Sequence, residues 1–569
     1  MRFGSASRLA TILGILVLSG CVTQTTPGSS QTNAPVAAQP RGPKILTLAV
    51  PAEPSDTLIR ELAFRRGGGL TTIGNIVHNR LVVENENLTY VPELIAEPMS
   101  IQNGNWQINS DGTMVTTWKL LSNVRWHDGA PFTSADLMFT YTVIKDPDVP
   151  TAVGAVLRLM QSAVAPDPYT FVVHWSRPYV DADQALGFSQ PLARHLLEDS
   201  YRGDKATFTN HPWFTREFVG LGPYRLVRWE SGVLMEFSRF DQYFRGRPPL
   251  DGVIVRFIPD DNTLIANLLA GELDIYPPAG LDPELAADAK GRWEAAGHRV
   301  GGHVSGGLFL LDFQHRTEWA RPVNGLATPQ VRRAFYHAVD RPELTRVVTD
   351  GLGPVANSWF PPRHPLHSQM EAAIPQYPYD LGRTQQILAQ AGWVRGSDGV
   401  LVHQESGDRF DVQLASRRTA QEQKIARIVS DYWRRAGARV EEAFRTLERT
   451  EADLEGLARL PGAIVQTGRY ERLYIDRYHS RNIATAADQW SGRNRGGYAN
   501  PRVDTLLDQL NSTIPSEQRV PLHQALLQEK VGDAAIMLLY WEYDPYFVSK
   551  SIRGPVGGEA WNFWEWDKE

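Results

Sequence analysis

Short apolar runs alternate with helical patterns along most of the chain. The run from Lys44 to Pro51 is apolar and ends at a proline, which predicts a first buried strand. Positions 115–124 alternate between apolar and polar residues and lead into an Asp-Gly turn. The stretch 135–141 behind this turn predicts a helix that Thr133 or Ser134 caps.

The same alternation of strands and helices returns further along. Residues 222–240 predict two strands joined at a Ser-Gly turn, and 253–259 predict another. Residues 260–263 (DDNT) supply a cap for the helix that follows, and the apolar spacing of 329–339 predicts an amphipathic helix. A further helix is predicted over 384–391. Strands that alternate with helices predict an α/β fold.

The amino terminus has the features of an export signal. Arg2 and Arg8 flank the start of an apolar stretch, Leu9 to Leu18, which is too short to span a bilayer and predicts a secretory signal over residues 1–20. The sequence Leu18-Ser19-Gly20-Cys21 resembles the lipobox of bacterial lipoproteins. That resemblance implies a lipid anchor on Cys21, the single cysteine; a chance cysteine in an ordinary signal peptide is the alternative.

Composition limits the partners and the source of stability. Residues 21–43 are rich in Thr, Gln, Ser, Ala, Pro and Gly, which predicts a lipidated flexible linker. The formal charge of −6 argues against nucleic acid as a partner. Without a cysteine pair, stability must come from apolar cores.

Several sequence blocks together resemble one family. Residues 125–133 (RWHDGAPFT) are similar to a stretch of the large peptide- and nickel-type solute-binding proteins, family 5 of the bacterial extracellular solute-binding proteins. Further blocks follow in the family's order: Gly222–Tyr224, Tyr243–Asp251, Ala270–Asp274, Val331–Phe335, Ala338–Arg341, Tyr498–Pro501 and Val503–Asp504. Together they span about residues 45 to 550.

The resemblance implies a two-lobed α/β periplasmic-binding-protein fold of type II, from the large cluster with an extra subdomain. Its discontinuous domains would be joined by hinge strands. The expected division is lobe one at 44–80, 215–300 and 510–569, the extra subdomain at 81–214, and lobe two at 301–509.

The implied function is solute capture outside the cytoplasm. We expect a monomeric, lipid-anchored periplasmic protein that takes up a peptide or a peptide-like polar solute between its lobes. It would deliver this solute to the permease of an ABC importer, without catalysis. A sensor or scaffold lipoprotein that kept the fold is the main alternative, and a periplasmic hydrolase is a more distant one.

Some signature residues have structural explanations of their own. Indole burial and Asp-Gly turn chemistry account for Trp126, His127 and Asp128 without a substrate. Asp340 and Arg341 are expected to form a helix cap and a helix-supporting ion pair.

The stretch 462–472 lacks the aspartate that pairs with the peptide ammonium group in many peptide-binding relatives. Residues 461–500 instead carry six arginines, at 469, 472, 477, 481, 493 and 495, which suit carboxylate or phosphate groups. Tyr470 and Trp490 offer stacking faces. An anionic or hydroxyl-rich ligand is one interpretation, and a solvated basic surface is the other.

Two more segments are expected at the ligand because the family's contacts lie there. They are the loop 65–70 and the strand end 312–314. The predicted ligand-binding residues are Arg66, Gly68, Phe313, Gln314, Arg469, Tyr470, Trp490 and Arg495.

No catalytic, metal or cofactor motif is found in the sequence. Residues 187–191 lack the second glycine of a nucleophile elbow, and Pro354 interrupts an apparent dinucleotide fingerprint at 351–356. The histidines at 364 and 367, and those at 298, 303 and 315, lack the carboxylate or thiol pattern that completes a metal site. We expect no cofactor and no bound metal, while the nickel or haem binding known in the wider family stays open.

Overall fold

A computed structural model describes residues 42–54, 57–59, 69–149, 154–185, 188–205, 207–446, 450–469, 476–554 and 562–569. The predicted signal peptide and Cys21 lie outside the described residues.

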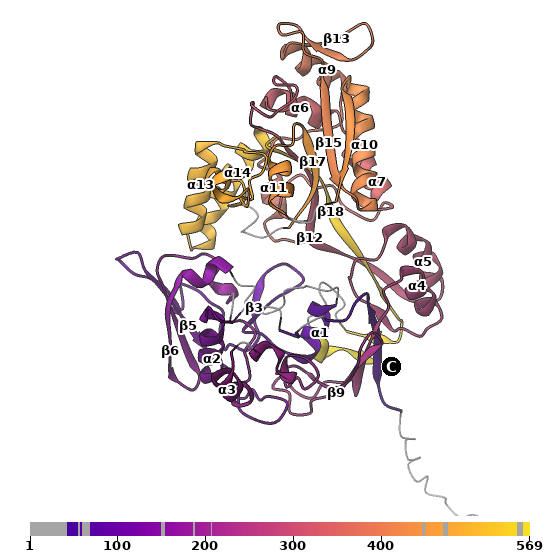
Figure 1. Cartoon of the computed structure of the whole chain (residues 1–569). Coiled ribbons are helices and arrows are strands. Elements are labelled where there is room, and N and C mark those ends of the chain that lie inside the picture. Colours follow the sequence, from indigo (N-terminus) through magenta and orange to yellow (C-terminus); the bar gives the residue numbers. More distant parts are fainter. Residues whose placement is uncertain are drawn as a thin grey trace, which may run out of the picture. The chain divides into compact units, whose positions relative to one another are not determined.

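Ten strands form one mixed sheet in the order β16-β15-β17-β12-β18-β11-β1-β10-β9-β8. They are β1 (Ile45–Val50), β8 (Tyr224–Glu230), β9 (Leu234–Arg239), β10 (Gly252–Phe257), β11 (Ile275–Tyr276), β12 (Arg299–Phe313), β15 (Asp411–Arg417), β16 (Arg439–Arg445), β17 (Ala463–Arg469) and β18 (Ile536–Val548). β1 runs parallel to β10 and β11, and β15 runs parallel to both β16 and β17. The β1 group lies in one lobe and the β15 group in the other (Figure 1).

The first lobe is organised around β1 and its neighbours. Leu46, Leu48 and Val253 from this part of the sheet share one buried cluster with Trp126 and Trp213. The other elements of this lobe are α1 (Leu70–Val77), α2 (Ser134–Lys145), α3 (Arg194–Gly203), the paired strands β2 (Val82–Glu84) and β3 (Tyr90–Pro92), β19 (Ile552–Arg553) and β20 (Asp567–Lys568), and the four-stranded sheet of β4 (Trp106–Ile108), β5 (Met114–Lys119), β7 (Thr170–Trp175) and β6 (Met160–Asp167). Two helices, α4 (Asp261–Leu269) and α5 (Pro283–Ala295), enclose a smaller core with Ala49 and Phe547.

The Trp-His-Asp-Gly block has a structural role in this lobe. Trp126 is fully buried, and the ring of His127 joins two chain segments. Its Nε2 donates to the Gly222 carbonyl at 3.0 Å, while its Nδ1 accepts the Gly220 amide at 3.1 Å. Gly222 packs against the backbone of Val77, where a Cβ would lie 2.4 Å from the carbonyl carbon. The family blocks at 125–133 and 222–224 therefore hold each other in place.

The second lobe contains its own core. Leu310 of β12, Phe335, Trp433, Leu527 and Trp541 belong to one buried cluster. The helices of this lobe are α6 (Pro329–His337), α7 (Arg341–Val348), α8 (His367–Glu371), α9 (Leu381–Gln390), α10 (Ala420–Ala436), α11 (Glu451–Ala458), α13 (Pro501–Ser512) and α14 (Ser516–Gly532), and a hairpin pairs β13 (Trp393–Arg395) with β14 (Leu401–His403).

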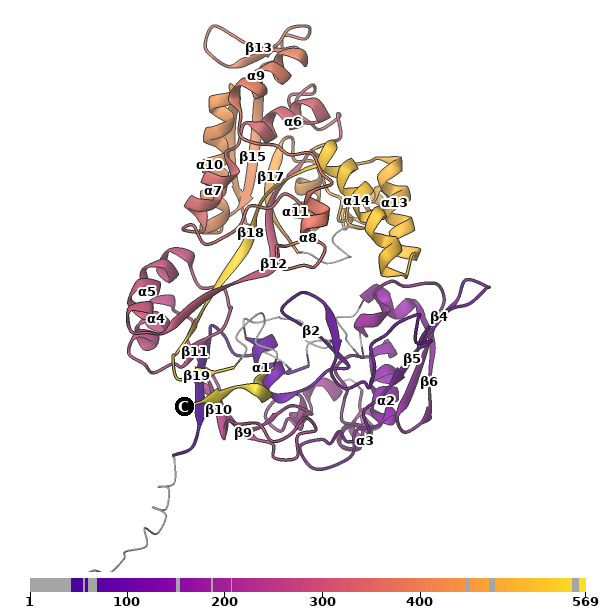
Figure 2. The same cartoon turned by 180° about the vertical axis from the view of Figure 1, so that it is seen from behind.

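The long antiparallel strands β12 and β18 connect the lobes, as both views show (Figures 1 and 2). Their register shifts between Val304 and Leu308, which marks a β-bulge. Gly302 lies under the ring of Tyr543, where a Cβ would come within 1.7 Å of the ring. Close packing of aromatic rings on glycine therefore fixes the path of both connecting strands.

Most of the helices and strands predicted from local sequence patterns are confirmed. β1 and α2 lie where the pattern predicts them, and a capping box of Thr133 and Asp136 starts α2. Asp260, within the cap predicted at 260–263, caps α4, and Asp340 caps α7 as expected. The prediction of a helix-supporting ion pair for Arg341 is wrong, because the buried guanidinium donates to the carbonyls of Ala356 and Leu538 instead. Buried carbonyls need a hydrogen-bond donor, so Arg341 pairs with the backbone rather than with an acidic side chain.

Candidate functional site

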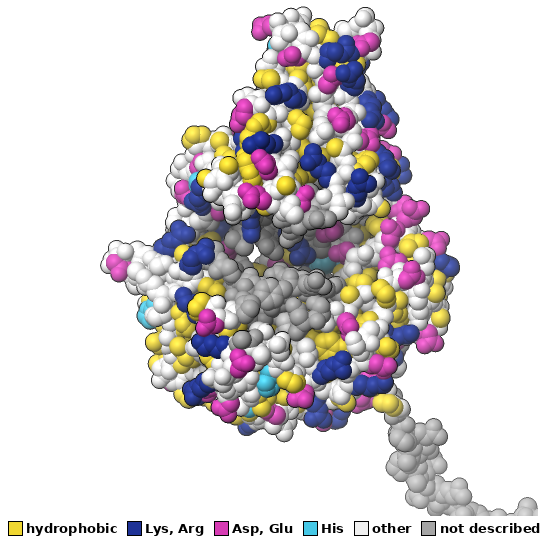
Figure 3. Space-filling model, viewed as in Figure 1, with side chains coloured by type: hydrophobic (Ala, Val, Ile, Leu, Met, Phe, Trp, Pro, Cys, Tyr) yellow, Lys and Arg dark blue, Asp and Glu magenta, His cyan; other side chains and the backbone are white. Residues whose placement is uncertain are grey.

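The surface is hollowed between the two lobes (Figure 3). On the side of lobe two, three neighbouring parallel strands end in arginine: Arg417 on β15, Arg445 on β16 and Arg469 on β17. In open α/β sheets, ligands bind at the carboxyl ends of the strands. The edge of this lobe that carries the three strand ends is therefore the expected side for a ligand.

A small pocket brings together three of the predicted ligand residues. Phe313, Gln314 and Arg495 line it, together with Asp312 and Gln466. Gln314 is 2% exposed, and its Nε2 donates to the carbonyls of Ala458 and Leu460, both at 2.9 Å. The carboxamide of Gln314 thus connects the end of β12 to the last residue of α11 and the segment that follows it, and its role toward a ligand stays a prediction.

Beside that pocket lies a buried polar network that the sequence interpretation did not include among the site residues. Arg477 donates from Nη2 to Asp312 Oδ2 at 3.0 Å and to Gln466 Oε1 at 2.8 Å. Burial raises the pKa of Asp312, and the positive charge of Arg477 opposes this rise. An aspartate inside the apolar run 308–313 is the sequence signal that such a partner exists.

Lys530 from α14 is buried next to this network. Its Nζ lies 4.0 Å from the centre of the Tyr478 ring and 4.5 Å from that of Trp359. Burial, followed by repulsion from Arg477, lowers the pKa of Lys530 to about 7. The positive charges of Arg477 and Lys530 therefore both act on the buried carboxylate of Asp312.

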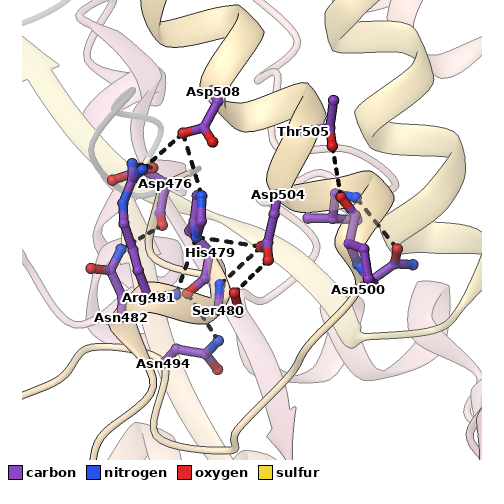
Figure 4. Close-up of polar contacts among 12 residues, drawn as sticks. Asp476, His479, Ser480, Arg481, Asn482, Asn494, Asn500, Asp504, Thr505 and Asp508 are labelled. Atoms are coloured by element: carbon purple, nitrogen blue, oxygen red, sulfur yellow. Dashed lines mark hydrogen bonds and ion pairs between the residues drawn. The ribbon is translucent and has the colours of Figure 1, made fainter.

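The arginines of residues 461–500 fall into different environments. Arg477 is buried in the network above, and Arg481 forms ion pairs with Asp476 at 2.9 Å and Asp508 at 2.8 Å (Figure 4). Arg469 is exposed, and no acidic partner is found for it among the described residues. Intramolecular pairing thus occupies part of the predicted basic segment, whereas the described residues supply no acidic partner for Arg469.

The same close-up shows His479 between two helical aspartates (Figure 4). Its Nδ1 lies 3.4 Å from Asp504 and its Nε2 lies 3.4 Å from Asp508, both on α13. Ser480 donates its amide to Asp504 at 2.9 Å and its hydroxyl to the same carboxylate. The serine hydroxyl is bound to the carboxylate and not to the imidazole, so these three residues attach α13 to the preceding loop rather than form a nucleophilic triad.

The remaining predicted residues are placed apart from that pocket or are not described. Trp490 is 6% exposed and packs with Ala458 and Trp319, and the guanidinium of Arg459 lies 5.1 Å from its ring centre. Arg66, Gly68 and Tyr470 lie outside the described residues.

No group of three or more His, Cys, Asp or Glu side chains within the described ranges is arranged to hold a metal ion. Of the histidines grouped in the sequence, His367 contacts the Phe360 carbonyl and His315 contacts that of Ala535. None of the described helices combines the length and apolar character that crossing a bilayer requires.

Comparison with known proteins gives a consistent result. Residues 90–492 match the family described as bacterial extracellular solute-binding proteins, family 5 middle. The chain is 24% identical over 567 residues to the oligopeptide-binding protein AppA of Bacillus subtilis, covering 97% of this chain and 96% of AppA.

Two solved structures share the fold over almost their full length. NikZ of Campylobacter jejuni in complex with Ni(L-His) superposes with a TM-score of 0.67 at 20% identity, covering 92% of this chain and 99% of NikZ. NikA of Brucella suis in complex with Fe(III)-EDTA gives a TM-score of 0.72 at 18% identity, covering 92% of this chain and all of NikA (100%). The predicted two-lobed periplasmic-binding-protein fold is thereby confirmed.

Proposed function

Because this chain belongs to the bacterial extracellular solute-binding proteins of family 5, we propose that it captures a solute for an ABC importer. The solute binds between the lobes and is passed to the permease without a covalent step. The observation that carries this proposal is the pair of separate cores joined by β12 and β18, with polar strand ends beside the hollow. Closure around a ligand needs that arrangement, because contacts from both lobes then stabilise the closed state.

The packing also supports a division into lobes. Lobe one comprises the cluster around β1 and the smaller core of α4 and α5, and the extra subdomain around β5 packs into the same cluster. We assign α14 to lobe two, because Leu526, Leu527 and Val531 are buried in the cluster that contains Leu310. The carboxyl-terminal part of lobe one then begins within β18 rather than at residue 510.

Location outside the cytoplasm follows from the family, and we propose that Cys21 carries a lipid. Replacing Cys21 with alanine should abolish incorporation of labelled palmitate and release the exported protein from membranes. Retention on membranes without label in wild-type protein would contradict the lipid anchor.

The ligand class is proposed from the relatives and from the site. AppA is an oligopeptide-binding protein, and the NikZ complex contains a nickel–histidine ligand. A peptide or a peptide-like polar solute fits both the family and the mixture of charged and amide groups beside the hollow.

Uptake measurements test the importer role. Small molecules released from natively purified protein are identified by mass spectrometry, and the main species is supplied in labelled form to cells with and without the gene. Uptake that depends on the gene supports import. Tight binding without any effect on uptake would instead support the sensor or scaffold function.

A further inference from the structure

Three basic side chains from separate segments gather near the point where β12 leaves lobe two. His303 lies on β12, Arg363 lies in the connection between α7 and α8, and Arg469 ends β17, where it pairs with Gly307 of β12. Arg363 donates from Nη1 to His303 Nδ1 at 3.2 Å and to the backbone carbonyl of Glu86 at 3.2 Å. Glu86 belongs to the turn between β2 and β3 of lobe one, so this basic cluster (His303, Arg363 and Arg469) reaches across the hollow.

His303 is neutral and has an unused donor. Burial, followed by the positive charges of Arg363 and Arg469, lowers its pKa to about 3. Nδ1 accepts the bond from Arg363, so the proton is on Nε2. His303 is only 4% exposed, and its Nε2 is buried without a hydrogen-bond partner in the described part of the chain. A buried donor without an acceptor is costly, and a ligand acceptor would remove that cost.

Two acidic residues of β18, Glu542 and Asp544, lie close to the basic cluster. Arg469 has no acidic partner in the described ranges, and Glu542 and Asp544 each take part in an interaction of their own. Asp544 is the strand partner of His303 on β18. Glu542 lies against Gly307, where its Oε2 would be 2.1 Å from an added Cβ. Two full positive charges and a neutral N–H donor next to these acids favour a singly charged acceptor over a multiply charged one.

We propose that the basic cluster binds a carboxylate group of the solute. The guanidinium of Arg469 presents two parallel donors to the carboxylate, and His303 Nε2–H gives it a further hydrogen bond. Arg363 adds positive charge and links the bound group to lobe one through the Glu86 carbonyl. This inference rests on the proposed function and assigns its ligand a free carboxylate, held at the carboxyl end of β17.

Paired probes test the inference directly. Purified protein is incubated with an equimolar pool of short synthetic peptides with free carboxyl termini, the same peptides as carboxyl-terminal amides, and simple organic acids with their amides. Bound members are recovered and quantified by mass spectrometry, and the best pair is titrated by calorimetry. The free acid should bind at least about tenfold more tightly than its amide, as expected for loss of a charge-assisted hydrogen bond.

Two matched variants locate the effect. Arg469→Gln should remove the preference for the free acid, because Arg469 is exposed and its loss leaves the fold intact. Arg383→Gln on α9 serves as the control, since Arg383 is also exposed and, among the described residues, its side chain bonds the neutral Gln386. Equal binding of acids and amides, or an equal effect of both variants, would overturn the carboxylate site while leaving solute capture intact. Failure of every member of the pool to bind, together with no co-purifying molecule, would overturn both proposals.

Discussion

Replacing Arg477 with methionine should destabilise lobe two strongly. The side chain of Arg477 is 10% exposed and that of Asp312 is 4% exposed, so their ion pair is shielded from water. Without Arg477, the Asp312 carboxylate keeps the Gln466 amide, 3.2 Å away, as its side-chain donor within the described network. Removing one partner of a buried pair costs about 3–5 kcal/mol. We expect a cost at the lower end of this range, because loss of the Arg477 charge raises the pKa of Lys530 and favours its charged form.

The sign of the pH dependence provides a second readout. Burial already raises the pKa of Asp312, and removal of Arg477 raises it further. The folded variant then binds a proton more readily than the unfolded chain. The loss of stability relative to the wild type should therefore shrink as the pH falls from about 7 toward the raised pKa of Asp312. Urea unfolding followed by tryptophan fluorescence at about pH 7 and about pH 5 measures this change.

Arg481→Met is the matched control for this prediction. Arg481 is 48% exposed and pairs with Asp476 and Asp508 at the surface, so its loss should cost only about 0.2–1 kcal/mol. Adding Asp312→Asn to Arg477→Met should recover much of the lost stability, because the buried carboxylate that lost its partner is then gone. An Arg477→Met variant no less stable than Arg481→Met would refute the reasoning.

Three further predictions concern the connecting strands and lobe one. Gly302→Ala brings a Cβ within 1.7 Å of the Tyr543 ring and should lower the free energy of unfolding by about 1–3 kcal/mol, measured by thermal unfolding. The control Gly291→Ala meets no atom within 4 Å and should be neutral or slightly stabilising, so equal effects of the two variants would exclude close packing as the cause. His127→Leu leaves the Gly220 amide and the Gly222 carbonyl unpaired, at about 1–3 kcal/mol each, and unchanged denaturant stability would contradict these bonds. Burial lowers the pKa of His78 to about 3 and that of His127 to about 4, below the unfolded value of 6.5. Wild-type stability should therefore fall as the pH drops from about 6.5 to about 4, and His127→Leu should make that fall shallower in denaturant titrations; identical slopes would argue against the lowered pKa.

Local signals were sufficient to predict much of the fold. Asp260, Thr133 and Asp340 each cap a helix that the sequence pattern locates, because capping depends on residues only a few positions apart. The connecting strand β12 was predicted only at its end. Its first half is glycine-rich and polar, and it is extended because it pairs with β18 more than two hundred residues away. Tyrosine rings on β18 occupy the space that side chains at Gly301 and Gly302 would need.

The candidate site was predictable only in part, because contacts between distant parts of the sequence decide which side chains come together. The pattern indicated an excess of arginine over 461–500, but it does not distinguish buried Arg477 from exposed Arg469. That difference depends on Asp312, which lies 165 positions from Arg477 in the sequence. His303 and Arg363 meet only after the chain has folded, 60 residues apart. Long-range pairing, rather than composition, decides which arginines remain available to a ligand.

Calorimetric titration of the molecule that co-purifies with the protein tests solute capture most directly. The predicted result is tight, reversible binding of one unmodified molecule per chain, with a negative heat-capacity change as the lobes bury apolar surface. Recovery of a chemically converted molecule, or the absence of saturable binding, would contradict the account.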